Sequence, residues 1–383
     1  MITPKTSRTL LLTALLAAPL LAACSGSAAD SVTFNVVEAT IPEMQQEMEE
    51  GRLTSRQLVE AHLIRIAMYE ERVNAVIAIN PNALADAERL DQERADGHVR
   101  GPLHGIPVAL KDNVHTMDMP TTGGAKAFED YFPPYEATIT TNLREAGAII
   151  IAKTVMTELA NFTAAGMPGN YSAIGGYGLN PYDPRRDPRD GRNDGRPVMG
   201  VGGSSSGIGT AMSFWAANVG TETSGSILSP ANSNMLAAIK PTVGRISRYG
   251  IIPISGDQDT AGPMARTVTD AAILLGVLES ASPDPNDAVT TLCQVPANGD
   301  YTTFLNLDGL QGARIGIPRA LYYDSIQVPG TNRWQSRMNE ESRAVMADAI
   351  AILETQGAIV VDPADIPSVI DTDPATSLVT NGG

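Results

Sequence analysis

Short, continuous apolar runs alternate with segments of helical periodicity, and this alternation constrains the fold more than any other feature of the sequence. Five apolar runs are expected to form strands: residues 75–80, 105–110, 148–152, 314–318 and 358–362. Apolar residues recur at helical spacing in the intervening segments, at 41–49, 55–69, 82–95, 137–145 and 340–354. Strands that are apolar along their whole length are typical of a sheet buried on both faces. The pattern therefore predicts an α/β fold with helices on both faces of a central sheet.

One predicted strand ends in a lysine. Lys111 follows the run at 105–110, and Asp112 and Asn113 come next and are expected to hold the lysine loop. Burial disfavours the charged form of an amine and lowers its pKa. A neutral amine can accept the proton of a serine hydroxyl, which makes the serine a nucleophile. Lys111 is therefore a candidate base, although a lone lysine at a strand end is more often a surface charge; Lys240 is its nearest competitor.

Two loops of small residues contain candidate nucleophiles. Residues 202–207 read Gly-Gly-Ser-Ser-Ser-Gly, and residues 220–226 read Gly-Thr-Glu-Thr-Ser-Gly-Ser. Glycine permits backbone conformations that other residues avoid, and consecutive N–H groups in such a turn form an anion pocket. Either loop alone would be read as flexible. Together with Lys111 they predict a serine nucleophile with a lysine base.

In this order the three segments resemble the amidase signature family, whose members hydrolyse amide bonds with a Ser–cis-Ser–Lys triad. The resemblance extends to residues 180–184, 238–245 and 259–270 and runs from about residue 41 to about residue 367. It implies a central mixed, twisted β-sheet covered by helices on both faces. It also implies an amidase that acts on a carboxamide or peptide amide through an acyl-enzyme.

The resemblance assigns a role to each residue of the triad. Ser226 is implied to be the nucleophile, Lys111 the base, and Ser204 the bridging serine that passes the proton between them. The implied oxyanion hole consists of four backbone N–H groups, those of Thr223, Ser224, Gly225 and Ser226. No cofactor and no metal are expected.

The chain departs from the family pattern at three places. Glu222 and Ser224 occupy positions where most members carry Asp and Gly. The segment between Ser204 and Ser226 is shorter than usual within residues 212–216, which is expected to rotate or retract the chain after it. The chain also stops at Gly383, where members of the family generally continue, so its C-terminal part is expected to be incomplete.

The first residues have the layout of an export signal. Lys5 and Arg8 precede the apolar run 10–23, which is short for a membrane span. The run ends in Leu-Ala-Ala-Cys24, which resembles a bacterial lipobox and implies cleavage before Cys24 and lipid attachment to its sulfur; an ordinary signal peptide is the alternative. We expect a signal peptide at 1–23, a tether at 24–40 and a single amidase-like domain at 41–383. The protein is thus expected at the bacterial cell envelope, membrane-anchored through lipid alone, or secreted or periplasmic if Cys24 is not lipidated.

Composition narrows the class of partner. The net charge of −16 argues against a nucleic-acid partner. Arginines gather only at 185–196, where aspartates alternate with them, so we expect a solvated loop there. The two cysteines, Cys24 and Cys293, offer no disulfide framework and no zinc spacing. A small-molecule or peptide amide substrate is the expected partner, and the oligomeric state is left open.

Three other functions match parts of the sequence. Residues 203–207 also fit the nucleophile elbow of α/β-hydrolases, with Ser205 as the nucleophile, but that family needs a later histidine. All four histidines precede it: His62, His98, His104 and His115. His104 is expected to be a packed core residue. A catalytically impaired surface lipoprotein with a binding role stays open, and an amide-hydrolysing amidotransferase subunit fits less well with an export signal.

Overall fold

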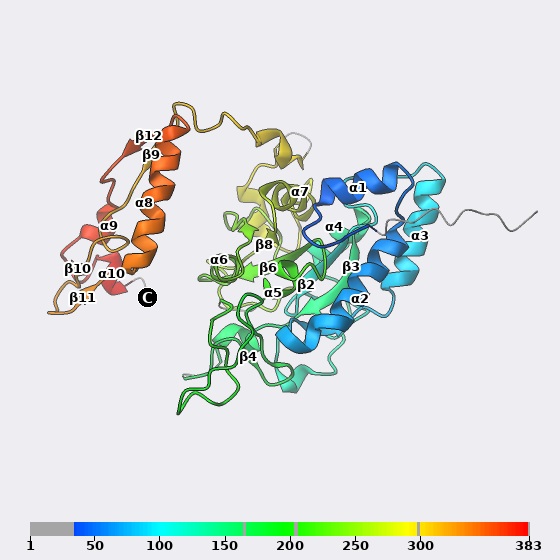
Figure 1. Cartoon of the computed structure of the whole chain (residues 1–383), viewed down its shortest axis with the longest axis horizontal. Coiled ribbons are helices and arrows are strands. Elements are labelled where there is room, and N and C mark those ends of the chain that lie inside the picture. Colours follow the sequence, from blue (N-terminus) through cyan, green and yellow to red (C-terminus); the bar gives the residue numbers. More distant parts are fainter. Residues whose placement is uncertain (1–33, 164–165, 203–205, 297–298, 382–383) are drawn as a thin grey trace, which may run out of the picture.

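The computed structural model describes residues 34–163, 166–202, 206–296 and 299–381. Its centre is a six-stranded sheet in the order β1-β3-β2-β6-β8-β7, of which Figure 1 labels β3, β2, β6 and β8. The strands in that order are β1 (Val76–Ile79), β3 (Ile149–Thr154), β2 (Pro107–Lys111), β6 (Ala217–Glu222), β8 (Thr260–Ala265) and β7 (Ala237–Ala238). β3, β2 and β6 run parallel, and the other adjacent pairs are antiparallel. The predicted mixed sheet is confirmed.

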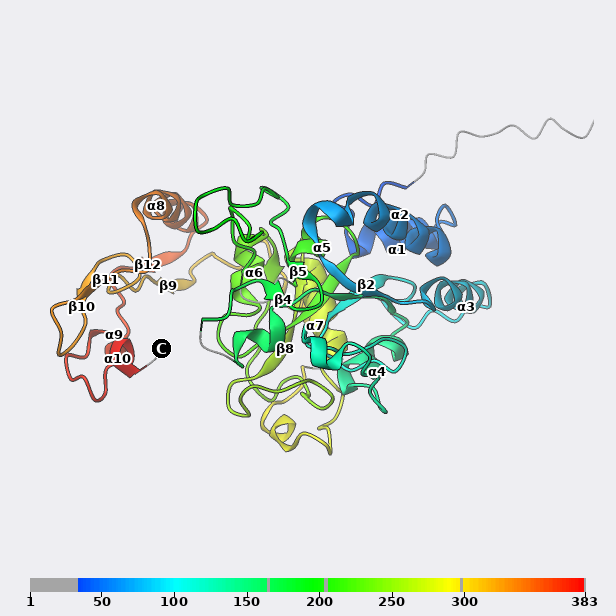
Figure 2. The same ribbon diagram turned by 90° about the horizontal axis from the view of Figure 1, so that it is seen from below.

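Helices cover both faces of this sheet, as Figure 2 shows. Successive residues of β2 point to opposite faces, so Ala109 lies in one apolar cluster and Val108 and Leu110 lie in the other. The Ala109 cluster contains buried side chains of α2 (Ser55–Val73), α3 (Ala83–Ala95) and α5 (Ile208–Ala211). The opposite cluster contains those of α1 (Ile41–Glu49), α4 (Thr138–Glu145) and α7 (Val268–Leu278). The predicted α/β layering is confirmed for this part of the chain.

Local sequence signals set the starts of the first two helices. Thr54 caps α2, because its hydroxyl accepts a hydrogen bond from the Gln57 backbone N–H at 3.1 Å, and the Gln57 side chain accepts one from the Thr54 N–H at 3.0 Å. Thr40 and Glu43 form the same reciprocal pair at α1. Both helices begin at the residues predicted from the sequence.

Three of the predicted buried strands are less buried than expected. β1 is half-buried because it is an edge strand that pairs with β3 alone among the described strands. β9 (Arg314–Gly316) and β12 (Ile359–Val361) pair in parallel as a separate two-stranded sheet. The neighbouring α8 (Glu340–Thr355), described in full, has no buried residue. The expectation that β9 and β12 are covered on both faces is therefore wrong.

Figure 1 shows the segment from β9 onward to one side of the central sheet. The remaining elements of that segment are short: β10 (Ile326–Gln327), β11 (Trp334–Gln335), α9 (Pro367–Ile370) and α10 (Leu378–Asn381). Elsewhere the short elements are η1 (Lys126–Phe128), η2 (Glu158–Asn161), β4 (Tyr171–Ser172), β5 (Gly176–Tyr177), α6 (Leu228–Ser233), η3 (Ala288–Leu292) and η5 (Tyr301–Phe304).

The predicted signal peptide and Cys24 lie outside the described residues. The predicted tether is too long at its C-terminal end, because Val36 and Ala39 are buried and Arg266 donates a hydrogen bond to the Ala39 carbonyl at 2.6 Å. The packed body therefore begins before residue 40. Among the described residues, no helix combines the length and apolar character needed to cross a membrane.

The arginine-rich loop pairs its charges internally. Arg185, Arg189 and Arg196 each form an ion pair with the aspartate two positions earlier, at 2.5–2.7 Å. All three arginine side chains remain at least 37% exposed. The prediction of a solvated loop at this site is confirmed.

Candidate active site

Lys111 lies at the carboxyl end of β2, in the middle of the sheet, and is 1% exposed. In the parallel pairing of β2 with β6, Leu110 lies opposite Val219, so the lysine reaches the carboxyl end of β6. Its Nζ donates hydrogen bonds to the backbone carbonyl and the Oγ1 of Thr221, both at 3.0 Å. The predicted burial of this amine is confirmed.

Burial lowers the pKa of Lys111 to about 7, because the charged amine loses its hydration. The carboxylates of Glu222 and Asp259 act in the opposite direction, since negative charge favours the ammonium form. A substantial fraction of the amine is therefore neutral near pH 7. A neutral amine at this position has a lone pair with which to accept a proton.

The turn that holds Ser226 follows the carboxyl end of β6, next to the carboxyl end of β2 where Lys111 lies. Gly225 has φ +93°, a left-handed conformation that suits glycine. The Glu222 carboxylate accepts hydrogen bonds from the backbone N–H groups of Ile227 at 2.7 Å and Leu228 at 2.9 Å. These bonds hold the backbone that follows the half-buried Ser226 against the side chain at the end of β6. The longer Glu side chain, in place of the more common Asp, therefore has a structural role.

Asp259 holds the start of the same turn. Its carboxylate accepts a hydrogen bond from the Thr223 hydroxyl, and also from the backbone N–H groups of Ile254 at 2.7 Å and Ser255 at 2.9 Å. Asp259 comes immediately before β8, and Thr260 pairs with Glu222 across the sheet. The oxyanion role of Thr223, Ser224, Gly225 and Ser226 stays a prediction.

Ser204 lies outside the described residues, but both flanks of its loop are described. A Cβ on Gly202 would lie 2.2 Å from the Pro230 nitrogen, so only glycine allows this close approach to α6. On the other flank, the Ser206 hydroxyl is buried without a hydrogen-bond partner among the described residues. It lies 3.5 Å from where a Cβ on Gly220 would stand. The described flanks thus lie beside α6 and β6, and the bridging role of Ser204 stays a prediction.

The short connection before β6 does not pull that strand out of the sheet. α5 ends at Ala211, and the chain turns at Ser213, which has φ +54°. β6 still pairs in register with β2 on one side and with β8 on the other. The expected retraction is therefore not seen in β6.

A second buried amine supports the lysine loop. Lys153 is 0% exposed, and its Nζ lies 3.6 Å from the Asp112 carboxylate. Asp112 in turn accepts hydrogen bonds from the backbone N–H of Thr122 and from that of Gly124 at 3.3 Å. Asn113 donates to Thr221 Oγ1, the anchor of Lys111, at 3.0 Å. Asp112 and Asn113 thus hold the loop, as predicted. Lys153 was missed, although it too directly follows an apolar run in the sequence.

Asp112→Ala is expected to destabilise the protein by about 3–5 kcal/mol, because it leaves the buried Lys153 amine without its counter-ion. Denaturant unfolding measures this change. Asp112→Ala combined with Lys153→Met removes both charges and should recover most of the loss. If the Asp112→Ala protein is as stable as the parent protein, the Asp112–Lys153 pair does not stabilise the fold in this way.

The two other residues considered as a base, Lys240 and His104, lie in surroundings different from those of Lys111. Lys240 is exposed, whereas Lys111 is buried. His104 is fully buried, and its Nε2 lies 2.9 Å from the Leu90 carbonyl. The expectation that His104 is a packed core residue is confirmed.

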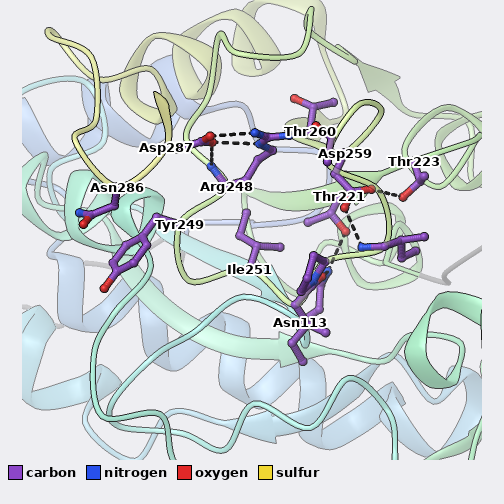
Figure 3. A pocket seen from close by; sticks show the side chains of 14 residues that line it. Asn113, Thr221, Thr223, Arg248, Tyr249, Ile251, Asp259, Thr260, Asn286 and Asp287 are labelled. Atoms are coloured by element: carbon purple, nitrogen blue, oxygen red, sulfur yellow. Dashed lines mark hydrogen bonds and ion pairs between the residues drawn. The ribbon is translucent and has the colours of Figure 1, made fainter. Parts of the chain in front are cut away.

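A pocket of about 240 Å³ adjoins the lysine anchor (Figure 3). Asn113, Thr221 and Thr223 line one side, and Arg248, Tyr249 and the run 251–254 line the rest together with residues 256, 259, 260, 286 and 287. The pocket thus borders both the partner of Lys111 and the first residue of the Ser226 turn. This arrangement could hold part of a substrate beside Lys111 and the Ser226 turn.

The family described as Amidase matches residues 57–380. A putative amidase of Schizosaccharomyces pombe is 39% identical over 330 residues, covering 84% of this chain and 52% of the relative. A glutamyl-tRNA(Gln) amidotransferase subunit of Chloroflexus aurantiacus is 36% identical over 84% of this chain and 60% of its own length.

Among solved structures, the native peptide amidase from Stenotrophomonas maltophilia aligns with a TM-score of 0.74 at 38% identity. The alignment covers 86% of this chain and 62% of the peptide amidase. The chain therefore spans between about half and two thirds of the length of these proteins.

Proposed function

The chain belongs to the amidase family, and on this premise we propose that it is a serine amidase that hydrolyses a carboxamide or peptide amide. The observation that carries the proposal is the buried Lys111 amine, whose pKa is lowered to about 7 at the edge of the sheet where the Ser226 turn begins. Burial of an amine is unfavourable, and Lys111, unlike Lys153, forms no ion pair with the described residues. A buried amine of this kind beside a pocket is typical of a catalytic group.

In the proposed reaction, neutral Lys111 takes the proton of the Ser226 hydroxyl by way of Ser204. The Ser226 oxygen then forms a bond to the amide carbon, and the negative oxygen is stabilised by the N–H groups of the turn. Lys111 returns the proton through Ser204 to the leaving nitrogen, and the carbon–nitrogen bond breaks. A water molecule repeats the sequence on the acyl-enzyme, releasing the carboxylic acid and restoring Ser226.

Activity is expected to rise with pH through about 7 and to level off above it. The pKa of Lys111 is lowered from 10.5 to about 7, so the amine is charged below that pH and cannot accept a proton. The kcat/KM of ammonia release from a primary amide, measured from pH 5 to 9, tests this. Asp259→Asn should move the rising limb to lower pH, because it removes a negative charge that favours the ammonium form. A flat profile would rule out lysine as the base.

The direct test of the function is turnover of primary amides by the purified protein. A folded protein that binds amides without hydrolysing them would favour the alternative, a catalytically impaired binding protein. Co-purification with the translation apparatus would favour the amidotransferase role that the Chloroflexus relative suggests.

We further propose that the protein is exported and lipid-anchored, a proposal supported by the charged and apolar run before Cys24. Cys24→Ser is expected to abolish incorporation of a clickable fatty acid and to release the protein from the membrane fraction. Cys293→Ser, which leaves the lipobox intact, should change neither. Membrane retention of the Cys24→Ser protein would contradict the lipid anchor.

A further inference from the structure

The pocket beside Lys111 has a chemical character that defines what can enter it. We propose, building on the amidase function proposed above, that it binds one neutral, apolar side chain adjacent to the amide that is cleaved. The substrates would then be amides of N-acylated amino acids or peptides with leucine- or phenylalanine-sized side chains. The walls, the charges, the size and one unpaired acceptor of the pocket all support this assignment.

The walls are mainly apolar and are held in place. Ile251, Ile252, Pro253 and Ile254 form a continuous run along the pocket. Tyr249 adds an aromatic face, and its ring stacks on that of Tyr135 at 4.9 Å between centroids and 20° between planes. A preformed apolar surface of this kind favours an apolar group, because both surfaces leave water on binding.

The charged groups in the pocket already have hydrogen-bond partners within the protein. The Arg248 guanidinium donates to both oxygens of Asp287, at 2.9 and 2.7 Å (Figure 3). It also donates to the Gly256 carbonyl. The Asp259 carboxylate accepts from Thr223 and from two backbone N–H groups. A charged substrate group would lose its hydration here and would find the Arg248, Asp287 and Asp259 groups already hydrogen-bonded within the protein, which is unfavourable. The pocket therefore selects against both acidic and basic side chains.

The size fits one side chain. At about 240 Å³ the pocket is smaller than the roughly 300–1,000 Å³ that holds a whole drug-sized ligand. The scissile amide itself would lie outside it, toward Lys111 and the Ser226 turn. This leaves the pocket to recognise the neighbouring side chain.

Asn113 supplies the remaining polar contact. It is 5% exposed, lines the pocket, and its Oδ1 has no hydrogen-bond partner among the described residues. A buried acceptor without a partner is unfavourable until a donor arrives. The N–H of an amide substrate is such a donor, so Asn113 would orient the substrate above the apolar walls.

Calorimetric binding to the Ser226→Ala protein tests the proposal without depending on turnover. N-acetyl-leucinamide is expected to bind roughly 10- to 100-fold more tightly than N-acetyl-lysinamide or the α-amide of N-acetyl-aspartate, given the gain from burying a leucine side chain. Ile254→Asp in the same background should remove the preference for leucine and favour lysine. The matched control is Ile64→Asp on α2, where the isoleucine is 61% exposed; it should leave the ranking unchanged. Asn113→Ala should weaken all three amides alike.

The outcomes separate this inference from the amidase function. Equal binding of the three amides, or a preference for leucine that survives Ile254→Asp in a protein with an unchanged melting temperature, would overturn the pocket assignment. If the parent protein binds the leucine amide selectively but hydrolyses none of these amides, the pocket assignment is supported and the proposed amidase function is refuted. Hydrolysis of the three amides without side-chain preference would support the amidase function and refute the pocket assignment.

Discussion

Ser226→Ala is expected to lower the kcat for amide hydrolysis by on the order of 10⁴- to 10⁶-fold, the range typical of losing a serine nucleophile. Without the hydroxyl no acyl-enzyme can form, and only binding and the N–H groups of the turn remain. The turn itself should persist, because Glu222 holds it through the backbone of Ile227 and Leu228. Ammonia release under saturating substrate measures the effect.

Ser224→Ala is the matched control for this variant. Ser224 is exposed in the same turn, and its implied contribution is a backbone N–H that alanine retains. Turnover of the Ser224→Ala protein should therefore stay close to that of the parent protein. Full activity of the Ser226→Ala protein would exclude Ser226 as the nucleophile.

Lys111→Met is expected to reduce kcat/KM about 100-fold or more, as loss of a general base does. Methionine fills a similar volume but cannot accept a proton. The fold should be as stable as that of the parent protein or more so, because an amine is no longer buried. Thermal unfolding measured beside activity separates the two effects.

Two further variants sharpen this prediction. Lys111→Arg should not restore activity, because a guanidinium keeps its proton in a protein. Lys240→Met removes an exposed amine and should leave turnover unchanged. Parent-level turnover by the Lys111→Met protein would show that another group accepts the proton.

Local signals predicted the parts of the fold that depend on a few neighbouring residues. The helical spacing of apolar residues placed the starts of α1 and α2 correctly, and the apolar run before Lys111 correctly indicated burial of its amine. Burial of β1, β9 and β12 was overestimated, since it depends on what lies beside each strand. Strand order could not be predicted either, because it is set by contacts between distant segments.

In the candidate site, too, local features could be predicted from the sequence and contacts between distant segments could not. The turn at 223–226 was found because its residue types are unusual, whereas its supports come from elsewhere in the chain. Asp259, immediately before β8, accepts a hydrogen bond from Thr223, and the sequence around neither residue predicts this contact. Lys153 did carry a local signal, since it follows the apolar run 148–152 as Lys111 follows the run 105–110. Its partner Asp112 is 41 positions away along the chain, so the pair was visible only in three dimensions.

The most direct test of a neutral Lys111 acting on Ser226 is covalent labelling by a fluorophosphonate, with the modified residue located by peptide mass spectrometry. We predict one adduct on Ser226, formed faster as the pH rises through about 7 and lost in folded Lys111→Met protein. An adduct on a different serine, or a folded parent protein that takes up no label at any pH, would contradict the claim that a neutral Lys111 activates Ser226.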